Sequence, residues 1–224
     1  MTTARYDGHA TWYDEFASAD VFTVVRRAAV SLLGTGPGRC LDLGCGTGRA
    51  IPLLADAGWA VDGCDVSGDQ LELARAHAGA RAEQLLVADA HALPFAGESF
   101  DGVVSILTHT DFDDLGGALR EVRRVLKCGG GFAYVGVHPC FAAPCIEQLE
   151  DGRSLVHPGY REAGWQFVSR DAAKPGIRSH VGINHLTLSA LLNATLDSGL
   201  TITAFVEPGE RDPPLFFGFR AEKT

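Results

Sequence analysis

The chain has 224 residues, 46% of them hydrophobic, and a formal net charge of −9. This length suits one α/β domain, and the acidic balance argues against a nucleic-acid partner, because phosphate binding needs a basic face. Residues 1–14 lack the apolar core of a signal peptide and no apolar run has membrane-spanning length, so we expect a cytoplasmic protein with no membrane partner.

The first part of the chain is expected to be helical. Apolar residues recur at helical spacing over 21–33 and Gly34 ends the run, so residues 1–34 are expected to form a helical N-terminal cap. Strand-like and helix-like segments then alternate. The expected strands are 39–43, 60–65, 85–88, 100–107, 132–137, 200–207 and 215–221. The expected helices are 49–57, 67–78, a segment from 113 or 114 up to Gly129-Gly130-Gly131, and 187–198.

This alternation predicts an α/β fold with a doubly wound, mostly parallel seven-stranded sheet and helices on both faces. A proline-containing turn joins the last two strands, which are therefore expected to form a C-terminal antiparallel pair. Ser67 has a side chain suited to capping the helix that follows it. We expect residues 1–224 to form a single domain.

Residues 138–185 break the alternation. They are rich in Gly and Pro, and they carry four aromatic residues and four histidines. Loops of this length inside a compact domain are usually functional, and the aromatic residues argue against disorder. We expect this segment to be an inserted lid on the side where an acceptor binds.

The six cysteines form neither a CxxC pair nor a His/Cys pattern with metal-site spacing. Cys40, Cys45 and Cys64 lie on or beside predicted buried strands, where a thiol behaves as a small hydrophobic group. We therefore expect reduced cysteines and no bound metal.

The segment 41–49, Leu-Asp-Leu-Gly-Cys-Gly-Thr-Gly-Arg, joins the first strand to a helix. Its glycines allow a sharp turn and bring backbone close to a ligand, so strand, loop and helix N-terminus can cradle a nucleotide-like cofactor. The dinucleotide fingerprint G-x-G-x-x-G is not complete, because Arg49 stands where its third glycine belongs. This disfavours a nicotinamide-dependent oxidoreductase, and the P-loop motif is absent.

The spacing Asp42-x-Gly44-x-Gly46-x-Gly48 resembles motif I of the class I S-adenosylmethionine-dependent methyltransferases. The resemblance implies S-adenosyl-L-methionine as cofactor and S-adenosyl-L-homocysteine as product. It also implies that the cofactor contacts Asp42, Gly44, Cys45 and Gly46.

Asp65 lies at the predicted end of the second strand, seventeen residues after Gly48. A carboxylate at this place can accept hydrogen bonds from both hydroxyls of a ribose. The alternative role, a helix N-cap, is already filled by Ser67. We therefore predict Asp65 as the ribose ligand, with Val66 beside it in the cofactor site.

The segment 88–95, Ala-Asp-Ala-His-Ala-Leu-Pro-Phe, resembles motif II of the same family. The resemblance implies that Asp89 accepts a hydrogen bond from the adenine amino group and that the Ala90 backbone N–H donates to the ring. Leu107, at the end of the fourth strand, is a further expected cofactor contact. Tyr6-Asp7 and Trp12-Tyr13-Asp14 resemble the family's N-terminal segment, in which Tyr13 would cap the methionine end.

The resemblance covers about residues 5–137, and the tail to 221 fits the family's final strand pair. Cys128 replaces the proline that usually precedes the glycines before the fifth strand, a departure that affects a turn. The chain is most similar to the type 11 domain group of small-molecule and natural-product methyltransferases.

Two histidines follow strands whose carboxyl ends should face the ligand, His109 after the fourth strand and His138 after the fifth. A histidine that titrates near neutrality suits proton abstraction from a phenol or enol, so both are candidate general bases. Alternatively, each ring only bonds backbone at a strand end. His157 and Tyr160 are the next candidates, as lining of an acceptor pocket under the lid.

We therefore predict in-line methyl transfer to a small organic acceptor, with O-methylation of a secondary metabolite favoured. The D/N-P-P-Y/F element of amino-methylating nucleic-acid enzymes is absent after the fourth strand, and Asp212-Pro213-Pro214 lies in the final turn. N- or C-methylation stays open, as does a protein that keeps the cofactor pocket but catalyses non-methyl chemistry or only binds. A homodimer is also left open.

Overall fold

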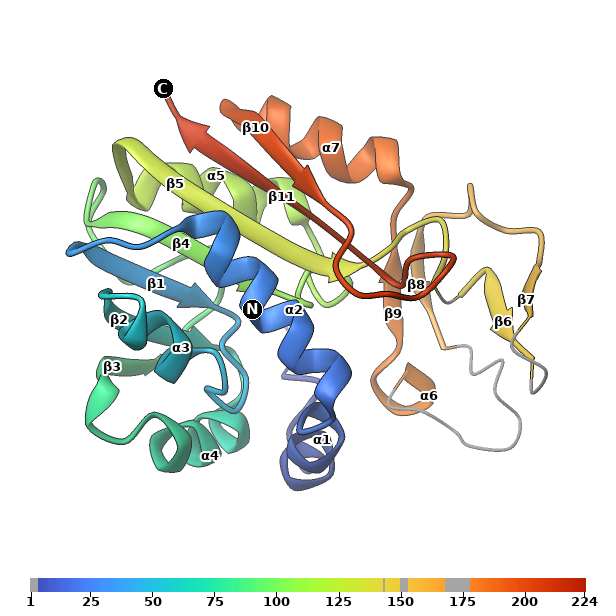
Figure 1. The fold of residues 1–224 in the computed structure, drawn as a ribbon, viewed down its shortest axis with the longest axis horizontal. Coiled ribbons are helices and arrows are strands. Elements are labelled where there is room, and N and C mark those ends of the chain that lie inside the picture. Colours follow the sequence, from blue (N-terminus) through green and yellow to red (C-terminus); the bar gives the residue numbers. More distant parts are fainter. Residues whose placement is uncertain (1–3, 143, 150–152, 168–177) are drawn as a thin grey trace.

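The computed structural model describes residues 4–142, 144–149, 153–167 and 178–224 (Figure 1). Seven strands form one sheet in the order β10-β11-β5-β4-β1-β2-β3. Their bounds are β1 (Arg39–Leu43), β2 (Ala60–Asp65), β3 (Ala82–Val87), β4 (Phe100–Ile106), β5 (Leu126–Val137), β10 (Leu200–Val206) and β11 (Phe216–Lys223). The pairs among β1 to β5 are parallel, whereas β11 runs antiparallel to β5 and to β10. The predicted doubly wound sheet with its antiparallel pair is confirmed.

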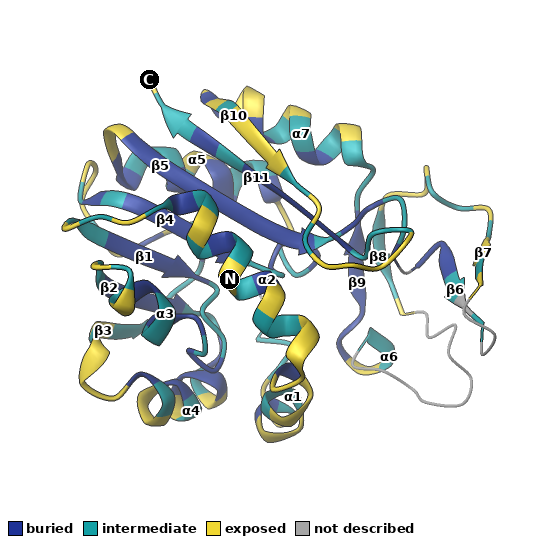
Figure 2. Ribbon diagram, in the orientation of Figure 1, coloured by how far each residue is buried: buried dark blue, intermediate teal, exposed yellow. Residues whose placement is uncertain are grey.

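Helices cover both faces of this sheet. Their bounds are α1 (Ala10–Ala17), α2 (Asp20–Leu33), α3 (Ile51–Asp56), α4 (Gly68–Ala78), α5 (Leu115–Val125) and α7 (Leu188–Asp197). Alternate residues of β5 point to opposite faces, so Phe132 packs in one core cluster with α5 and α7, and Ala133 packs in the other with α2 and α3. Figure 2 shows the central strands β1, β4 and β5 buried between these layers.

Several expected boundaries differ from the structure. Helix α3 begins at Ile51, two residues late, because the glycine loop continues past Gly48. Strand β3 begins at Ala82, where it pairs with Val61 of β2. Helix α5 ends at Val125, and the three glycines expected to end it lie inside β5 instead.

The glycines 129–131 are needed where β5 enters the sheet. The register between β4 and β5 shifts between Phe100 and Gly102, and Gly129 has a φ of 77°. A Cβ added at Gly130 would lie 2.9 Å from the backbone oxygen of Lys127. The glycines therefore allow close backbone approach inside the sheet, a role that local sequence does not distinguish from ending a helix.

The expected helix cap at Ser67 is confirmed, since its side chain accepts a hydrogen bond from the Gln70 backbone N–H. Among the described residues, the thiols of Cys40, Cys45, Cys64, Cys128 and Cys140 are free. Within the described ranges, no helix is both long and apolar enough to span a bilayer.

The described part of 138–185 contains short elements that the sequence pattern did not predict. They are β6 (Ile146–Gln148), β7 (Ser154–Val156), β8 (Gly164–Gln166), α6 (Arg178–Val181) and β9 (Ile183–His185). β6 pairs with β7 and β8 with β9, each antiparallel. They lie beyond the carboxyl ends of β1 and β5, at the right of Figure 1. Residues 143, 150–152 and 168–177 of the expected lid lie outside the described residues.

Candidate functional site

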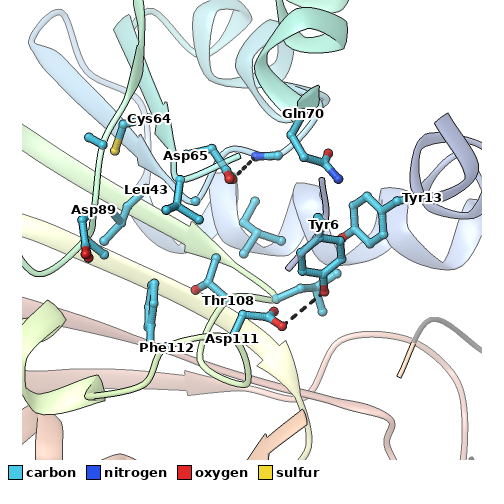
Figure 3. Close-up of a pocket in the computed structure, with 17 residues that line it drawn as sticks. Tyr6, Tyr13, Leu43, Cys64, Asp65, Gln70, Asp89, Thr108, Asp111 and Phe112 are labelled. Carbon is cyan, nitrogen blue, oxygen red and sulfur yellow. Dashed lines mark hydrogen bonds between the residues drawn. The ribbon is translucent and has the colours of Figure 1, made fainter. Parts of the chain in front are cut away.

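A pocket of about 680 Å³, here called the main pocket, opens at the carboxyl ends of β1, β2 and β4 (Figure 3). Eight residues predicted from the sequence line it, namely Tyr13, Gly44, Gly46, Asp65, Val66, Asp89, Ala90 and Leu107. Other lining residues were not predicted, among them Tyr6, Gln70, Thr108, Asp111 and Phe112. The sequence therefore identified one wall of the pocket and missed most of the opposite wall.

The glycine loop forms that first wall without side chains. Gly44, Gly46 and Gly48 all have positive φ, at 69°, 53° and 74°. A Cβ on Gly44 would lie 2.5 Å from Thr108 Cγ2, and one on Gly48 would lie 3.0 Å from Ala74. The loop thus needs glycine for its conformation and for close packing on both sides.

Asp65 holds the loop as well as facing the pocket. Its Oδ2 accepts a hydrogen bond from the Gly46 backbone N–H at 2.8 Å, and its Oδ1 accepts one from Ser67 N–H at 2.9 Å. Burial raises the pKa of Asp65, although these two backbone bonds act to lower it. A preorganised carboxylate at the end of β2 is the arrangement that recognition of a diol needs.

Asp42 and Cys45 line a neighbouring hollow of about 450 Å³, here called the side pocket, instead of the main pocket. Tyr13, Gly44, Gly46 and Leu107 line both spaces, so the two are adjacent. Asp42 is buried, and its Oδ2 has no hydrogen-bond partner among the described residues. Arg26 lines the same hollow. An unpartnered carboxylate oxygen and a guanidinium are complementary to the ammonium and carboxylate of an amino acid.

Leu107 has a φ of 63°, a strained value for a residue with a branched side chain, and its N–H donates to Val135 O at 2.8 Å. Strain of this kind is found at ligand sites, and Leu107 lies between the two pockets.

The N-terminal segment closes the far side of the main pocket. The rings of Tyr6 and Tyr13 meet edge to face with centroids 5.0 Å apart, and the Tyr6 hydroxyl donates to Asp111 Oδ1 at 3.2 Å. Arg178, from α6, donates to the same oxygen at 2.7 Å. Arg49 donates two bonds to Asp14 of α1, at 2.7 and 2.8 Å. Arg49, the departure from the dinucleotide fingerprint, thus anchors the cap beside the site.

Comparison with known proteins agrees with this geometry. Residues 41–134 match the family model described as a methyltransferase domain. The chain is 31% identical to the O-methyltransferase resE of Aspergillus sclerotiorum over 196 residues, which cover 75% of this chain and 73% of that protein. The chain belongs to the S-adenosylmethionine-dependent methyltransferases.

A solved methyltransferase has the same fold. The S-adenosylmethionine-dependent methyltransferase of Mesorhizobium loti superposes with a TM-score of 0.70 at 26% identity, covering 96% of this chain and 99% of that chain. The O-methyltransferase rstn1 of Aspergillus nomiae is 33% identical over 139 residues, which cover 53% of this chain and 62% of that protein. The chain spans less than two thirds of the length of several further curated relatives.

The residues fit the cofactor of this family. The glycine cradle would be filled by a Cβ, and Asp42, with its unpartnered oxygen, lines a pocket adjacent to that of Asp65. Gln70 also has both side-chain amide atoms buried without a hydrogen-bond partner, and it lines the main pocket. Such groups are stabilised when a polar ligand supplies the missing partners.

The two histidines expected as methyltransferase bases do not line the main pocket. His109 is buried against Tyr134, whose hydroxyl is hydrogen-bonded to His109 Nδ1. Burial lowers the pKa of His109 to about 3, and the charge of Arg178 adds to this. The ring lies in the core beneath Thr108, and the general-base role stays a prediction.

His138 is also held by protein groups. Its Nδ1 accepts a hydrogen bond from the Cys140 backbone N–H at 3.1 Å, and its Nε2 lies 3.3 Å from Glu207 Oε1. Burial lowers the pKa of His138, although Glu207 acts to raise it. These contacts fit the alternative role for His138, a ring that only forms hydrogen bonds with protein groups at a strand end.

His157 and Tyr160 line neither pocket. His157 Nε2 lies 2.7 Å from Glu147 Oε2, and the Tyr160 hydroxyl accepts a hydrogen bond from the Leu188 N–H at 2.8 Å. The first contact lies within the inserted segment, and the second joins this segment to α7. Their assignment to an acceptor pocket stays a prediction.

The affinity of this methyltransferase for S-adenosylhomocysteine is expected to rise as the pH increases from 6 to 8. Burial, helped by the charge of Asp65, raises the pKa of Asp42 from 3.8 to about 7, so the carboxylate that attracts an ammonium group forms above that pH. Calorimetry of the wild type and of Asp42→Asn across this range measures the effect. The variant should bind weakly and lose the pH dependence, and an unchanged slope would contradict the assignment.

The raised pKa of Asp42 also makes the folding stability of the ligand-free protein depend on pH. The folded state keeps its proton on Asp42 up to a higher pH than the unfolded state does, because the folded pKa is raised. The stability contributed by this proton is therefore lost as the pH rises from about 3.8 to about 7. Asp42→Asn should remove this part of the decline, as thermal melts without ligand would show.

Proposed function

We propose that this chain transfers a methyl group from S-adenosylmethionine to a hydroxyl group of a small organic acceptor. The observation that carries the proposal is the pair of adjacent pockets, the main and the side pocket, which share a glycine wall and are lined by carboxylates. Asp89 and Asp65 line the main pocket, and Asp42 lines the side pocket.

The charge of this space favours a cationic cofactor. Among the described residues that line the main pocket, three are aspartates and none is Lys, Arg or His. A sulfonium with an ammonium group is attracted to such a site, whereas the pyrophosphate of a nicotinamide cofactor would be repelled. Arg49, the nearest cation on the glycine loop, is already paired with Asp14.

Each part of the cofactor has residues suited to hold it. Asp65 would hold the ribose, and Asp89 with the Ala90 backbone N–H would hold adenine. Asp42 and Arg26 would hold the ammonium and carboxylate of the methionine end, with Tyr13 as the aromatic wall. When bound, S-adenosylmethionine supplies a methyl group already activated by the sulfonium charge, so positioning supplies most of the catalysis that the protein must add.

The acceptor is proposed to be apolar and aromatic, of the secondary-metabolite type. The aromatic side chains Tyr6, Tyr13 and Phe112 line the main pocket, and two curated relatives are named O-methyltransferases. The inserted segment 138–185 would act as the lid, since its Trp165 and Arg178 contact Asp113 and Asp111 beside the pocket. We propose that cap and lid belong to a single domain.

A cytoplasmic location is proposed on the free thiols of Cys40, Cys45, Cys64, Cys128 and Cys140, because reducing compartments keep cysteines unpaired. A homodimer stays a prediction.

Two measurements test the function. Calorimetry should detect S-adenosylhomocysteine binding and no NADH binding, and the reverse result would refute the cofactor assignment. Incubation with methyl-labelled S-adenosylmethionine and a panel of phenols, with aliphatic amines as the comparison, should transfer label to phenolic oxygen. Label only on nitrogen or carbon would refute O-methylation, and binding without any transfer would favour a non-methyl function.

A further inference from the structure

A histidine that no motif assigned lies directly behind the pocket carboxylate Asp89. The backbone N–H of His91 donates to Asp89 Oδ1 at 3.0 Å, and His91 Nδ1 lies 2.7 Å from the same oxygen. On the other side of the ring, Nε2 lies 2.8 Å from the backbone oxygen of Asp114, the residue before α5. His91 thus bridges the adenine end of the pocket and the first turn of a helix.

Both ring partners of His91 are acceptors. A backbone carbonyl oxygen can only accept, so Nε2 carries a proton, and the Asp89 carboxylate is an acceptor at Nδ1. One partner at each ring nitrogen therefore fixes the orientation of the imidazole between Asp89 and the start of α5.

The ring is also fixed sterically. A Cβ added at Gly117 in α5 would lie 2.6 Å from Asp114 Oδ2 and 3.0 Å from His91 Cδ2, so the absence of a side chain there leaves space for both the Asp114 side chain and the ring. The Phe112 ring stands edge to face with His91, with centroids 6.2 Å apart, and Phe112 itself lines the main pocket. Asp89 and His91 are each only 22% exposed, which limits screening of their contact by water.

We propose that His91 is a positioning residue that fixes the orientation of the Asp89 carboxylate and thereby sets the preference of the pocket for a 6-amino purine. The proposal rests on the cofactor assignment under the proposed function. His91 does not line the main pocket, and it acts through Asp89. Without the His91 ring, Asp89 keeps the bond from the backbone N–H of residue 91 but loses the contact with Nδ1, so its carboxylate is held less firmly and a hydrogen bond to the amino group costs more entropy.

The test compares two ligands that differ at one group. S-Adenosylhomocysteine and its analogue with hydrogen in place of the 6-amino group are titrated into the wild type, His91→Ala and Asp89→Ala. The wild type should prefer the amino ligand by about tenfold or more, because a hydrogen bond to a charged group is lost in the analogue. Both variants should reduce this preference to within about threefold.

A purely structural role predicts a different pattern. If His91 only stabilises the loop, His91→Ala weakens both ligands equally and the preference persists, which overturns the proposal. His77→Ala is the matched control: it also removes an imidazole hydrogen-bonded to a backbone oxygen, but that oxygen belongs to Thr47 of the glycine loop and not to the segment of Asp89. Its preference ratio should equal that of the wild type.

A second variant covers the case in which His91→Ala does not fold. Gly117→Ala keeps the imidazole but displaces it, and alanine is a better helix former than glycine. Its preference should fall between those of the wild type and Asp89→Ala, and a wild-type ratio would count against the proposal. Wild-type protein that binds neither ligand refutes the proposed cofactor, whereas equal binding of both ligands refutes only the adenine assignment of Asp89 and His91.

Discussion

Gly44→Ala is expected to weaken S-adenosylhomocysteine binding on the order of 100-fold. The backbone of residue 44 has a φ of 69°, which costs a non-glycine residue about 1–3 kcal/mol. The new methyl group would also lie 2.5 Å from Thr108 Cγ2, with Thr108 itself bonded to Ser105. The loop must move to relieve the backbone strain and the clash with Thr108. It then no longer forms the wall that the two pockets share.

Calorimetry on the purified variant measures this loss, and a thermal melt confirms that the variant is folded. Gly68→Ala is the matched control, because an added Cβ there meets nothing within 4 Å and Gly68 begins α4, close to the same site. The control should bind like the wild type. Wild-type affinity in Gly44→Ala would show that the ligand does not approach this backbone.

Asp65→Ala is expected to reduce cofactor affinity at least about tenfold, and on the order of 100-fold if both ribose hydroxyls lose their partner. A hydrogen bond to a charged group contributes about 1.5–3 kcal/mol, and about 1.4 kcal/mol corresponds to a tenfold change. The substitution also removes the acceptor of the Gly46 and Ser67 N–H groups, so the glycine loop loses a fixed contact.

Comparing ribose and 2′,3′-dideoxyribose forms of S-adenosylhomocysteine separates these two effects. The wild type should discriminate strongly between them, and Asp65→Ala should discriminate little, even where loop loosening weakens both. Asp56→Ala, an exposed carboxylate of α3 paired with Arg81, serves as the control. Undiminished discrimination in Asp65→Ala would remove the ribose assignment.

The parts of the site that were predictable from sequence are those fixed by local geometry. The glycine loop and Asp65 follow from a strand, a turn and a helix contiguous in the chain, and the structure brings them together at the ends of β1 and β2. Asp89 follows in the same way from the end of β3. At such positions the turn itself orients the residue, so the spacing of residues along the sequence is sufficient to predict that the residue belongs to the site.

The opposite wall could not be predicted because distant contacts build it. Tyr6 reaches the pocket by bonding Asp111, and Asp111 in turn is held by Arg178. The available signal was that Asp111 closely follows the fourth strand, as His109 does. Position after a strand does not decide side-chain direction, and His109 points into the core instead of the pocket. The expectation that the glycines 129–131 end a helix was wrong for the same reason. Pairing with β4 and β11, which are distant in the sequence, places this segment in the sheet.

The contacts of Tyr6 and Arg178 show how far the region matched by the family model can build the pocket by itself. Residues 41–134 carry the matched methyltransferase model, with the glycine loop and the carboxylates of β2 and β3. That stretch does not include the pocket residues Tyr6 and Tyr13. It also lacks α2 and β11, whose side chains complete the two core clusters. With the proposed cofactor, the signature region would supply purine and sugar recognition, while enclosure of the ligand would depend on chain segments on either side of it. Divergence among relatives outside the signature can change ligand retention and acceptor choice while nucleoside recognition stays the same.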